Sequence, residues 1–382
     1  MANYDYEIVN GRKIRVRPKE TVSEIDKNGY FRRQPNHFTT PFGDGENDLK
    51  AEGNKRYRLV WAKLCHWSNR AAIVRELEGL EDQISVNMVE HAPHEKNLGW
   101  EYVYNENNID PVLGDQFLSE AYYRADDDYQ GRTTVPALID TTTGKVVNND
   151  YNWLTTYFEV NFRPWHKKGA PELYPVELRE EIDKMNFWLF DNINNAVYRS
   201  SFSRSNEGHF DGVNTFYAAM DRLEKRLETN RFLFGDYVTD SDIRLYVTLA
   251  RLDIRYTAQL GETKRPLYTY KNLWGYAKEL WEIPAFAHHT DFAAIIRQGR
   301  IEGEEDGFRA STHYDLALPK IDWDAQWKVS TERAYLSSDP THPIYLGNNR
   351  RFDIDPTWYD LGAESPKKEE KETPPSCGCC CG

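Results

Sequence analysis

The first regular pattern of apolar and polar positions along the chain lies between residues 57 and 89. A short β-prone run predicts a strand over residues 57–61. Apolar positions with helical spacing follow within residues 68–77, and Gly79 suits the end of that helix. Residues 84–89 alternate apolar and polar side chains, which is typical of a strand. Together these elements predict a strand–helix–strand unit with Cys65 at the entrance of its helix.

The following stretch predicts further elements of the same layer. Residues 91–132 are polar with scattered aromatic side chains, which indicates an insertion over the surface. Residues 134–140 predict a strand that is entered through Pro136, and residues 145–147 a short return strand. A helix is expected to begin near Tyr151, after a polar run that can cap it. The predicted order is therefore βαβ followed by ββα.

Beyond Pro175 the apolar positions repeat with the helical period, which predicts an all-α region. Thr239 and Asp242 have the spacing of a capping box at the start of one of its helices. Further helices are expected over residues 270–281 and 285–297. Two apolar stripes mark the earlier helices: Leu178, Ile182, Met185, Leu189, Ile193 and Val197 in the first, and Phe210, Val213, Tyr217, Met220, Leu223 and Leu227 in the second.

These patterns divide the chain into an α/β domain, an all-α domain and three less regular parts. The α/β domain is expected at 51–165 and the helical domain at 175–300. Residues 1–50 are predicted to form an irregular lead-in, and residues 301–362 an irregular extension rich in aromatic side chains. Those aromatic side chains are expected to pack on the globular body or on a partner subunit. Residues 363–382 are predicted to be a disordered, Cys-rich tail.

Composition and charge narrow the class of protein. Of the 382 residues, 40% are hydrophobic, and 48 basic side chains face 61 acidic ones, for a net charge of −13. This balance disfavours a protein that binds the phosphate backbone of nucleic acids. No apolar run reaches the roughly 18 residues that a membrane helix needs. Because the N-terminus also has no secretory-signal pattern, we expect a cytoplasmic protein without a membrane partner.

The cysteines are unevenly distributed along the chain. Four of the five cysteines lie in the last six residues, as Cys377, Cys379, Cys380 and Cys381, so that Cys65 is the only thiol of the globular part. A disulfide framework inside the fold is therefore excluded. The tail thiols could bind a soft metal, relay disulfides or accept acyl chains, or they could form a flexible segment without a role at the active site. No metal site is expected in the globular part.

Cys65 is the candidate nucleophile, although a lone cysteine is often only a small buried hydrophobe. The first turn of a helix favours the thiolate, which is the reactive form in thiol exchange. A cis bond at Val135-Pro136 would leave the Val135 backbone free to pair with an extended, peptide-like ligand, whereas the alternative is an ordinary strand entrance. Cys65, Val135-Pro136 and the helix start after Asp150 follow the order of a thioredoxin-like layer.

Several motifs carry a resemblance to a known family. The chain resembles the glutathionyl-hydroquinone reductases, the xi class of glutathione transferases, over roughly residues 57–300. Its most specific motifs are Cys65-His66-Trp67-Ser68, similar to the family's Cys-Pro-Trp-Ala turn, and Gly131-Arg132-Thr133-Thr134-Val135-Pro136, similar to Gly-Arg-x-Thr-Val-Pro. Gly99-Trp100-Glu101-Tyr102 resembles Gly-Trp-x-Phe, and Asn148-Asn149-Asp150-Tyr151 is similar to Asn-Asn-Glu-Ser.

The resemblance implies a thioredoxin-like N-terminal domain, a helical glutathione-transferase domain, and glutathione bound between them as co-substrate. It implies that the Cys65 thiolate attacks a glutathionyl adduct of a quinone-like or other aromatic acceptor, to give a Cys65–glutathione mixed disulfide. A homodimer is a further expectation from the family. The residues implied to hold the tripeptide are Trp100, Arg132, Val135, Pro136 and Asp150. Those implied to face the acceptor are Tyr198, His66 and Tyr256, with Tyr198 also assigned to catalysis.

The sequence also departs from the family pattern at both halves of the expected site. His66 stands where the family has proline, Tyr151 where a serine contacts the γ-glutamyl carboxylate, and Gln298-Gly299 where a His-Tyr pair is usual. These departures leave open a different low-molecular-weight thiol, or a binding or scaffold protein of the same fold without turnover. A metal- or redox-buffering protein that works through the Cys tail is a further alternative.

Overall fold

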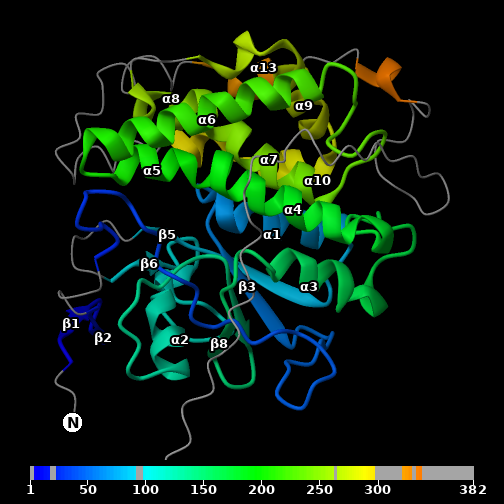
Figure 1. The fold of residues 1–382 in the computed structure, drawn as a ribbon. Coiled ribbons are helices and arrows are strands. Elements are labelled where there is room, and N and C mark those ends of the chain that lie inside the picture. The colour runs from blue at the N-terminus through cyan, green and yellow to red at the C-terminus, as the bar shows by residue number, and fades with distance from the viewer. Residues whose placement is uncertain are drawn as a thin grey trace, which may run out of the picture.

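The computed structural model describes residues 4–17, 23–91, 98–261, 265–296, 321–328 and 333–337. They form two lobes: an α/β lobe, in the lower half of Figure 1, and a helical lobe above it. Residues Gln298-Gly299, the Cys tail and most of the predicted 301–362 extension lie outside the described residues.

The α/β lobe is built on a four-stranded mixed sheet. Its strands are β3 (Tyr57–Trp61), β4 (Ile84–Met88), β7 (Ala137–Asp140) and β8 (Lys145–Asn148), in the order β4-β3-β7-β8. β3 pairs in parallel with β4 and antiparallel with β7, and β7 pairs antiparallel with β8. The parallel pair needs a crossover, which α1 (His66–Leu77) supplies. The predicted βαβ and ββ units are confirmed.

Both faces of this sheet are covered, because alternate residues of a strand point to opposite faces. Leu59 and Leu138 pack in one core with α1 and with α3 (Leu154–Val160). Val60 and Ile139, one residue further along, pack in a second core on the opposite side. This alternation explains why β3 is buried along its whole length.

The second core contains a helix that the sequence pattern did not predict. Residues 91–132 were expected to form a surface insertion, and this expectation is wrong for α2 (Leu118–Ala125), whose Leu118 and Tyr122 are fully buried under the sheet. Glu120 caps the helix, since its Oε1 accepts hydrogen bonds from the backbone N–H groups of Gln116 (2.8 Å) and Phe117 (3.0 Å). The helix has only 8 residues, so its apolar spacing is a weak signal in a polar stretch.

The expectation of a wholly irregular lead-in is also wrong. β1 (Tyr6–Val9) and β2 (Arg12–Arg15) form an antiparallel hairpin through an Asn10-Gly11 turn, where both residues have positive φ (50° and 78°). Asn-Gly is the preferred pair for such a turn, so this signal was present in the sequence. The chain between residues 23 and 50 then reaches the helical lobe, where the Gly29 carbonyl accepts from Arg204 N (2.6 Å).

The helical lobe confirms the predicted all-α region. Its main helices are α4 (Arg179–Leu189), α5 (Ala196–Phe202), α6 (Asn206–Arg226), α7 (Asp240–Arg251), α9 (Lys271–Trp281) and α10 (Pro284–His288). The first apolar stripe is fully buried, but a π-helical turn at Phe190–Asn194 divides it between α4 and α5. In the second stripe Phe210 is exposed and the other members are buried. Asp242 caps α7 as predicted, accepting from Thr239 N at 2.8 Å.

Part of the aromatic extension packs on this lobe. Trp323 and Trp327 of α13 (Trp323–Trp327) are buried, and the Trp327 ring centroid lies 5.1 Å from that of Trp274 and 5.5 Å from that of Phe292. The expectation that these aromatic side chains lie against a surface is thus met at two positions by the globular body. Tyr335 is exposed.

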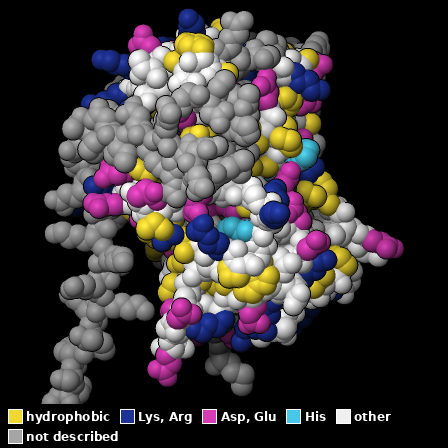
Figure 2. Space-filling view, turned by 90° about the vertical axis from the view of Figure 1, so that its right-hand side faces the viewer, with side chains coloured by type: hydrophobic (Ala, Val, Ile, Leu, Met, Phe, Trp, Pro, Cys, Tyr) yellow, Lys and Arg dark blue, Asp and Glu magenta, His cyan; other side chains and the backbone are white. Residues whose placement is uncertain are grey.

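The surface and helices give two further observations. On the face shown in Figure 2, basic and acidic side chains are interspersed rather than gathered into one basic patch. Within the described ranges, every helix is too short or too polar to cross a membrane.

Candidate active site

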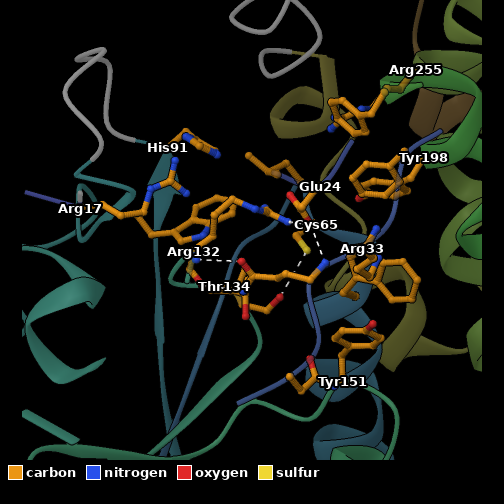
Figure 3. A pocket seen from close by; sticks show the side chains of 18 of the residues that line it. Arg17, Glu24, Arg33, Cys65, His91, Arg132, Thr134, Tyr151, Tyr198 and Arg255 are labelled. Carbon is orange, nitrogen blue, oxygen red and sulfur yellow. Dashed lines mark hydrogen bonds and ion pairs between the residues drawn. The ribbon is translucent and has the colours of Figure 1, made fainter. Parts of the chain in front are cut away.

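A cavity of about 530 Å³ opens between the two lobes, and Cys65 lies in its wall (Figure 3). The wall is assembled from the lead-in, from the α/β lobe and from the helical lobe. The volume is within the range of small-molecule sites. The side chains that line it include Arg17, Glu24, Phe31, Arg33 and Asn36 from the lead-in, Cys65, Trp67, Trp100, Arg132, Val135 and Tyr151 from the α/β lobe, and Tyr198, Phe202, Arg204 and Arg255 from the helical lobe.

Cys65 is the N-cap residue of α1, with extended backbone angles (φ −83°, ψ 116°), so its side chain lies beside the first turn of the helix. Its carbonyl accepts the first helical hydrogen bond, from Asn69 N at 3.0 Å. Its Sγ lies 3.8 Å from the Val135 carbonyl oxygen. The Val135–Pro136 peptide bond is cis. The structure thus places the thiol, a helix N-terminus and the Val135 backbone at one point of the cavity wall.

His66 and Tyr256, predicted to face the acceptor, lie behind this wall. They are 1% and 2% exposed, and neither lines the cavity. His66 Nδ1 is 3.1 Å from Thr248 Oγ1 and 3.2 Å from Tyr256 Oη. Burial, reinforced by the positive charge of Arg251, Arg33, Arg70 and Arg255, lowers the pKa of His66 well below its ordinary value of 6.5. These surroundings therefore disfavour a protonated, positively charged His66 beside Cys65.

The buried, neutral His66 predicts a specific pH dependence of stability. Its pKa is lower in the folded than in the unfolded chain, so its contribution is complete above about pH 6.5 and is lost as the pH falls, by up to ~1.4 kcal/mol per pH unit. We expect the His66→Gln variant to lose less free energy of unfolding than the wild-type protein when the pH falls below about 6.5. Urea unfolding of both proteins at about pH 7.5 and 5.5 measures the difference. Equal losses in the two proteins would show that His66 is accessible to protons in the folded state.

Arg251 of α7 holds the turn that precedes Cys65. It is fully buried, and its Nε and Nη2 donate to the carbonyl oxygens of Leu64 (2.8 Å) and Lys63 (2.9 Å). Its Nη1 donates to Asn69 Oδ1 (3.2 Å) and to Val247 O (2.8 Å). One guanidinium therefore joins the helical lobe to the active-site turn through three residues of the α/β lobe.

The residues predicted to hold glutathione are divided between the wall and a layer just behind it. Trp100, Arg132 and Val135 line the cavity, whereas Pro136 and Asp150 do not. Asp150 is buried, which raises its pKa, and its Oδ1 accepts from Asn36 Nδ2 at 2.9 Å. Asn36 itself lines the cavity, so Asp150 lies one side chain away from it.

Sequence reasoning missed the contribution of the lead-in, which carries none of the motifs of the resemblance. Arg33 stacks over Trp67 and Tyr198, with its guanidinium carbon 4.5 and 4.4 Å from the ring centroids. Glu24 accepts from Arg132 Nη2 at 2.8 Å and so fixes a predicted ligand-binding side chain. The run Tyr30-Phe31-Arg32-Arg33, with two aromatic and two basic side chains, is visible in the sequence. Nothing in the sequence pattern indicates that this run lies beside Cys65.

A thioredoxin-like lobe with a cysteine at the entrance of its first helix, joined across a cavity to a helical lobe, defines a glutathione transferase. The family model described as "Glutathione S-transferase, C-terminal domain" matches residues 196–279. The chain is 35% identical to glutathione S-transferase omega-like 2 of Schizosaccharomyces pombe, over 70% of this chain and 88% of the relative. It is 33% identical to glutathionyl-hydroquinone reductase YqjG of Escherichia coli, over 63% and 73%.

Solved structures agree with these relatives. The xi glutathione transferase of Phanerochaete chrysosporium superimposes with a TM-score of 0.64 at 33% identity, over 71% of this chain and 87% of that one. The glutathione-bound structure of YqjG from Escherichia coli gives a TM-score of 0.64 at 31% identity, over 73% and 92%. The chain belongs to the glutathionyl-hydroquinone reductases, the xi class of glutathione transferases. It is a glutathione-dependent enzyme, and glutathione is its co-substrate.

Proposed function

We propose that this enzyme removes glutathione reductively from glutathionyl adducts of quinone-like aromatic compounds, with Cys65 as the nucleophile. The observation that carries the proposal is the position of Cys65 Sγ, at the N-terminus of α1 in the wall of the interlobe cavity and 3.8 Å from the Val135 carbonyl. The thiol faces a cavity whose volume is in the range of small-molecule sites and admits a ligand of the size of a glutathione adduct.

The reaction has two steps. In the first, the Cys65 thiolate attacks the glutathione sulfur, the bond between that sulfur and the aromatic carbon breaks, and the carbon receives the electron pair and a proton. The aromatic acceptor leaves reduced, and Cys65 is oxidised to a mixed disulfide with glutathione. In the second, a glutathione thiolate attacks that disulfide, which releases oxidised glutathione and restores the Cys65 thiolate.

The proposed roles of the other residues follow from their places around the cavity. Trp100, Arg132 and the Val135 backbone hold the tripeptide, and Asp150 acts on its γ-glutamyl amine from behind Asn36, which lines the cavity. Tyr198, on the opposite lobe, faces the acceptor ring. His66 and Tyr256 support the acceptor side only from behind, because neither lines the cavity.

The mixed disulfide provides the direct test. We expect that full-length protein treated with one equivalent of a glutathionyl-hydroquinone gains one glutathionyl group, and that peptide mapping by mass spectrometry places it on Cys65. Added glutathione should remove the group and yield oxidised glutathione. Peptide mapping is essential because the chain has four further cysteines in its tail, and any free thiol can exchange with a disulfide. Release of hydroquinone without any adduct on Cys65 would contradict the proposed mechanism.

A further inference from the structure

The helical lobe contributes a chemically uniform wall to the cavity. Each of the four side chains that it supplies is either aromatic or an arginine: Tyr198, Phe202, Arg204 and Arg255. In the proposed function, glutathione is held by the α/β lobe, so this wall faces the acceptor. The side chains of this wall therefore indicate which chemical class of acceptor the cavity binds.

The aromatic part of the wall is continuous with the lead-in. The Phe202 ring centroid lies 5.6 Å from that of Tyr198 and 5.5 Å from that of Phe31. Phe31 also lines the cavity. Three neighbouring rings provide an apolar surface against which a flat aromatic acceptor can pack.

Arg33 of the lead-in and Arg204 of the helical lobe place positive charge beside these rings. Arg33 donates from Nε to Asn195 Oδ1 at 2.9 Å, while its Nη2 is buried without a hydrogen-bond partner among the described residues. Across the part of the chain that the structure describes, no carboxylate forms an ion pair with Arg33 or with Arg204, which is exposed at the rim. Figure 3 shows Arg33 on the same side of Cys65 as Tyr198 and Arg255.

Acidic side chains are scarce around the same cavity. Among its described lining residues, Glu24 is the one carboxylate against five arginines, although the whole chain has a net charge of −13. Glu24 is engaged by Arg132 (2.8 Å) and by Gln34 N (2.7 Å). Arg17 and Arg132 lie on the opposite side of Cys65 from Arg33, where the proposed function places glutathione. A cavity lined by one sign of charge concentrates ligands of the other sign.

We infer that the preferred acceptor is an anionic aromatic compound, a hydroquinone whose ring carries a carboxylate or sulfonate. This inference rests on the proposed function. The ring packs on Phe31, Tyr198 and Phe202, and the anionic substituent binds Arg33 and Arg204. Arg33 and Arg204 are thus specificity-determining residues.

The test compares two substrates that differ by one charge. The adducts are S-glutathionyl-2,5-dihydroxybenzoate and S-glutathionyl-1,4-hydroquinone, and the readout is kcat/KM from the formation of oxidised glutathione. We expect the wild-type protein to prefer the carboxylated adduct by roughly tenfold or more at low salt. The double variant Arg33→Gln/Arg204→Gln should lose this preference, because its kcat/KM for the carboxylated adduct falls roughly tenfold further than its kcat/KM for the uncharged adduct. Because each ratio is measured on one protein sample, partial loss of folded enzyme cancels.

Arg32→Gln is the matched control. Arg32 is adjacent to Arg33 but is exposed and pairs with Asp26 at 2.9 Å, so its variant should keep the wild-type preference. Raising the salt from ~0.05 M to ~0.5 M should reduce the preference of the wild-type protein.

The remaining outcomes separate the inference from the proposed function. Equal turnover of both adducts by the wild-type protein overturns the inference and leaves the proposed function intact. An equal loss on both adducts in the double variant also overturns it, because the arginines would then bind the glutathione part that the adducts share. Turnover of neither adduct overturns the proposed function and the inference together.

Discussion

Replacement of Cys65 by serine is expected to lower the turnover of a glutathionyl-hydroquinone by at least about a thousandfold. A serine hydroxyl is not ionised at neutral pH and cannot form the mixed disulfide, so both steps of the proposed reaction are blocked. The side chain is only 8% exposed and differs by one atom, so the free energy of unfolding should change by no more than about 1 kcal/mol. Steady-state kinetics and urea unfolding measure the two quantities on the same preparation.

The tail thiols supply the control for this variant. A protein in which Cys377, Cys379, Cys380 and Cys381 are all serine should retain wild-type turnover, because the proposed chemistry uses Cys65 alone. If this protein loses activity while Cys65→Ser keeps it, the nucleophile lies in the tail and the proposed site is wrong.

Arg251→Met is expected to give the largest loss of stability, about 2–4 kcal/mol in the free energy of unfolding. The substitution leaves the carbonyl oxygens of Lys63 and Leu64 buried without their donor, and it removes a polar connection between the two lobes. Activity of the remaining folded protein should also fall, since these carbonyls fix the turn before Cys65. Urea unfolding followed by circular dichroism measures the loss.

Arg32→Met is the comparison variant, because it removes the same guanidinium from an exposed position. It should change the free energy of unfolding by less than about 0.5 kcal/mol. If Arg251→Met also changes the free energy of unfolding by less than about 0.5 kcal/mol, the hydrogen bonds of Arg251 contribute little to stability.

The sequence predicted the fold well wherever apolar positions repeat over a long stretch. The stripe from Leu178 to Val197 and the capping box at Thr239 both correspond to buried or capped positions in the helical lobe. It failed where elements are short. Helix α2 buries Leu118 and Tyr122 in barely two turns, and the π-helical turn after α4 leaves the apolar spacing almost unchanged. Such local changes in geometry do not alter the pattern on which the prediction rests.

The site was predictable only in the segments that carry family motifs. Cys65, Trp100, Arg132 and Val135 line one cavity, yet the family roles assigned to them stay predictions. Arg33 could not be placed beside Cys65, because its position depends on the path of an irregular segment across the gap between the lobes. The direction of the His66 side chain, away from the cavity, depends on contacts with α7 that lie far away in sequence.

The contact of Gly29 with the start of α6 bears on how much of the chain the enzyme needs. A Cβ at Gly29 would lie 2.9 Å from the Ser205 Cβ, so the lead-in is seated closely on the helical lobe before it supplies Phe31 and Arg33 to the cavity. A fragment cut at residue 51, the boundary suggested by the sheet alone, would retain the thiol but have an open-sided pocket. The residues that close the pocket therefore begin well upstream of the sheet.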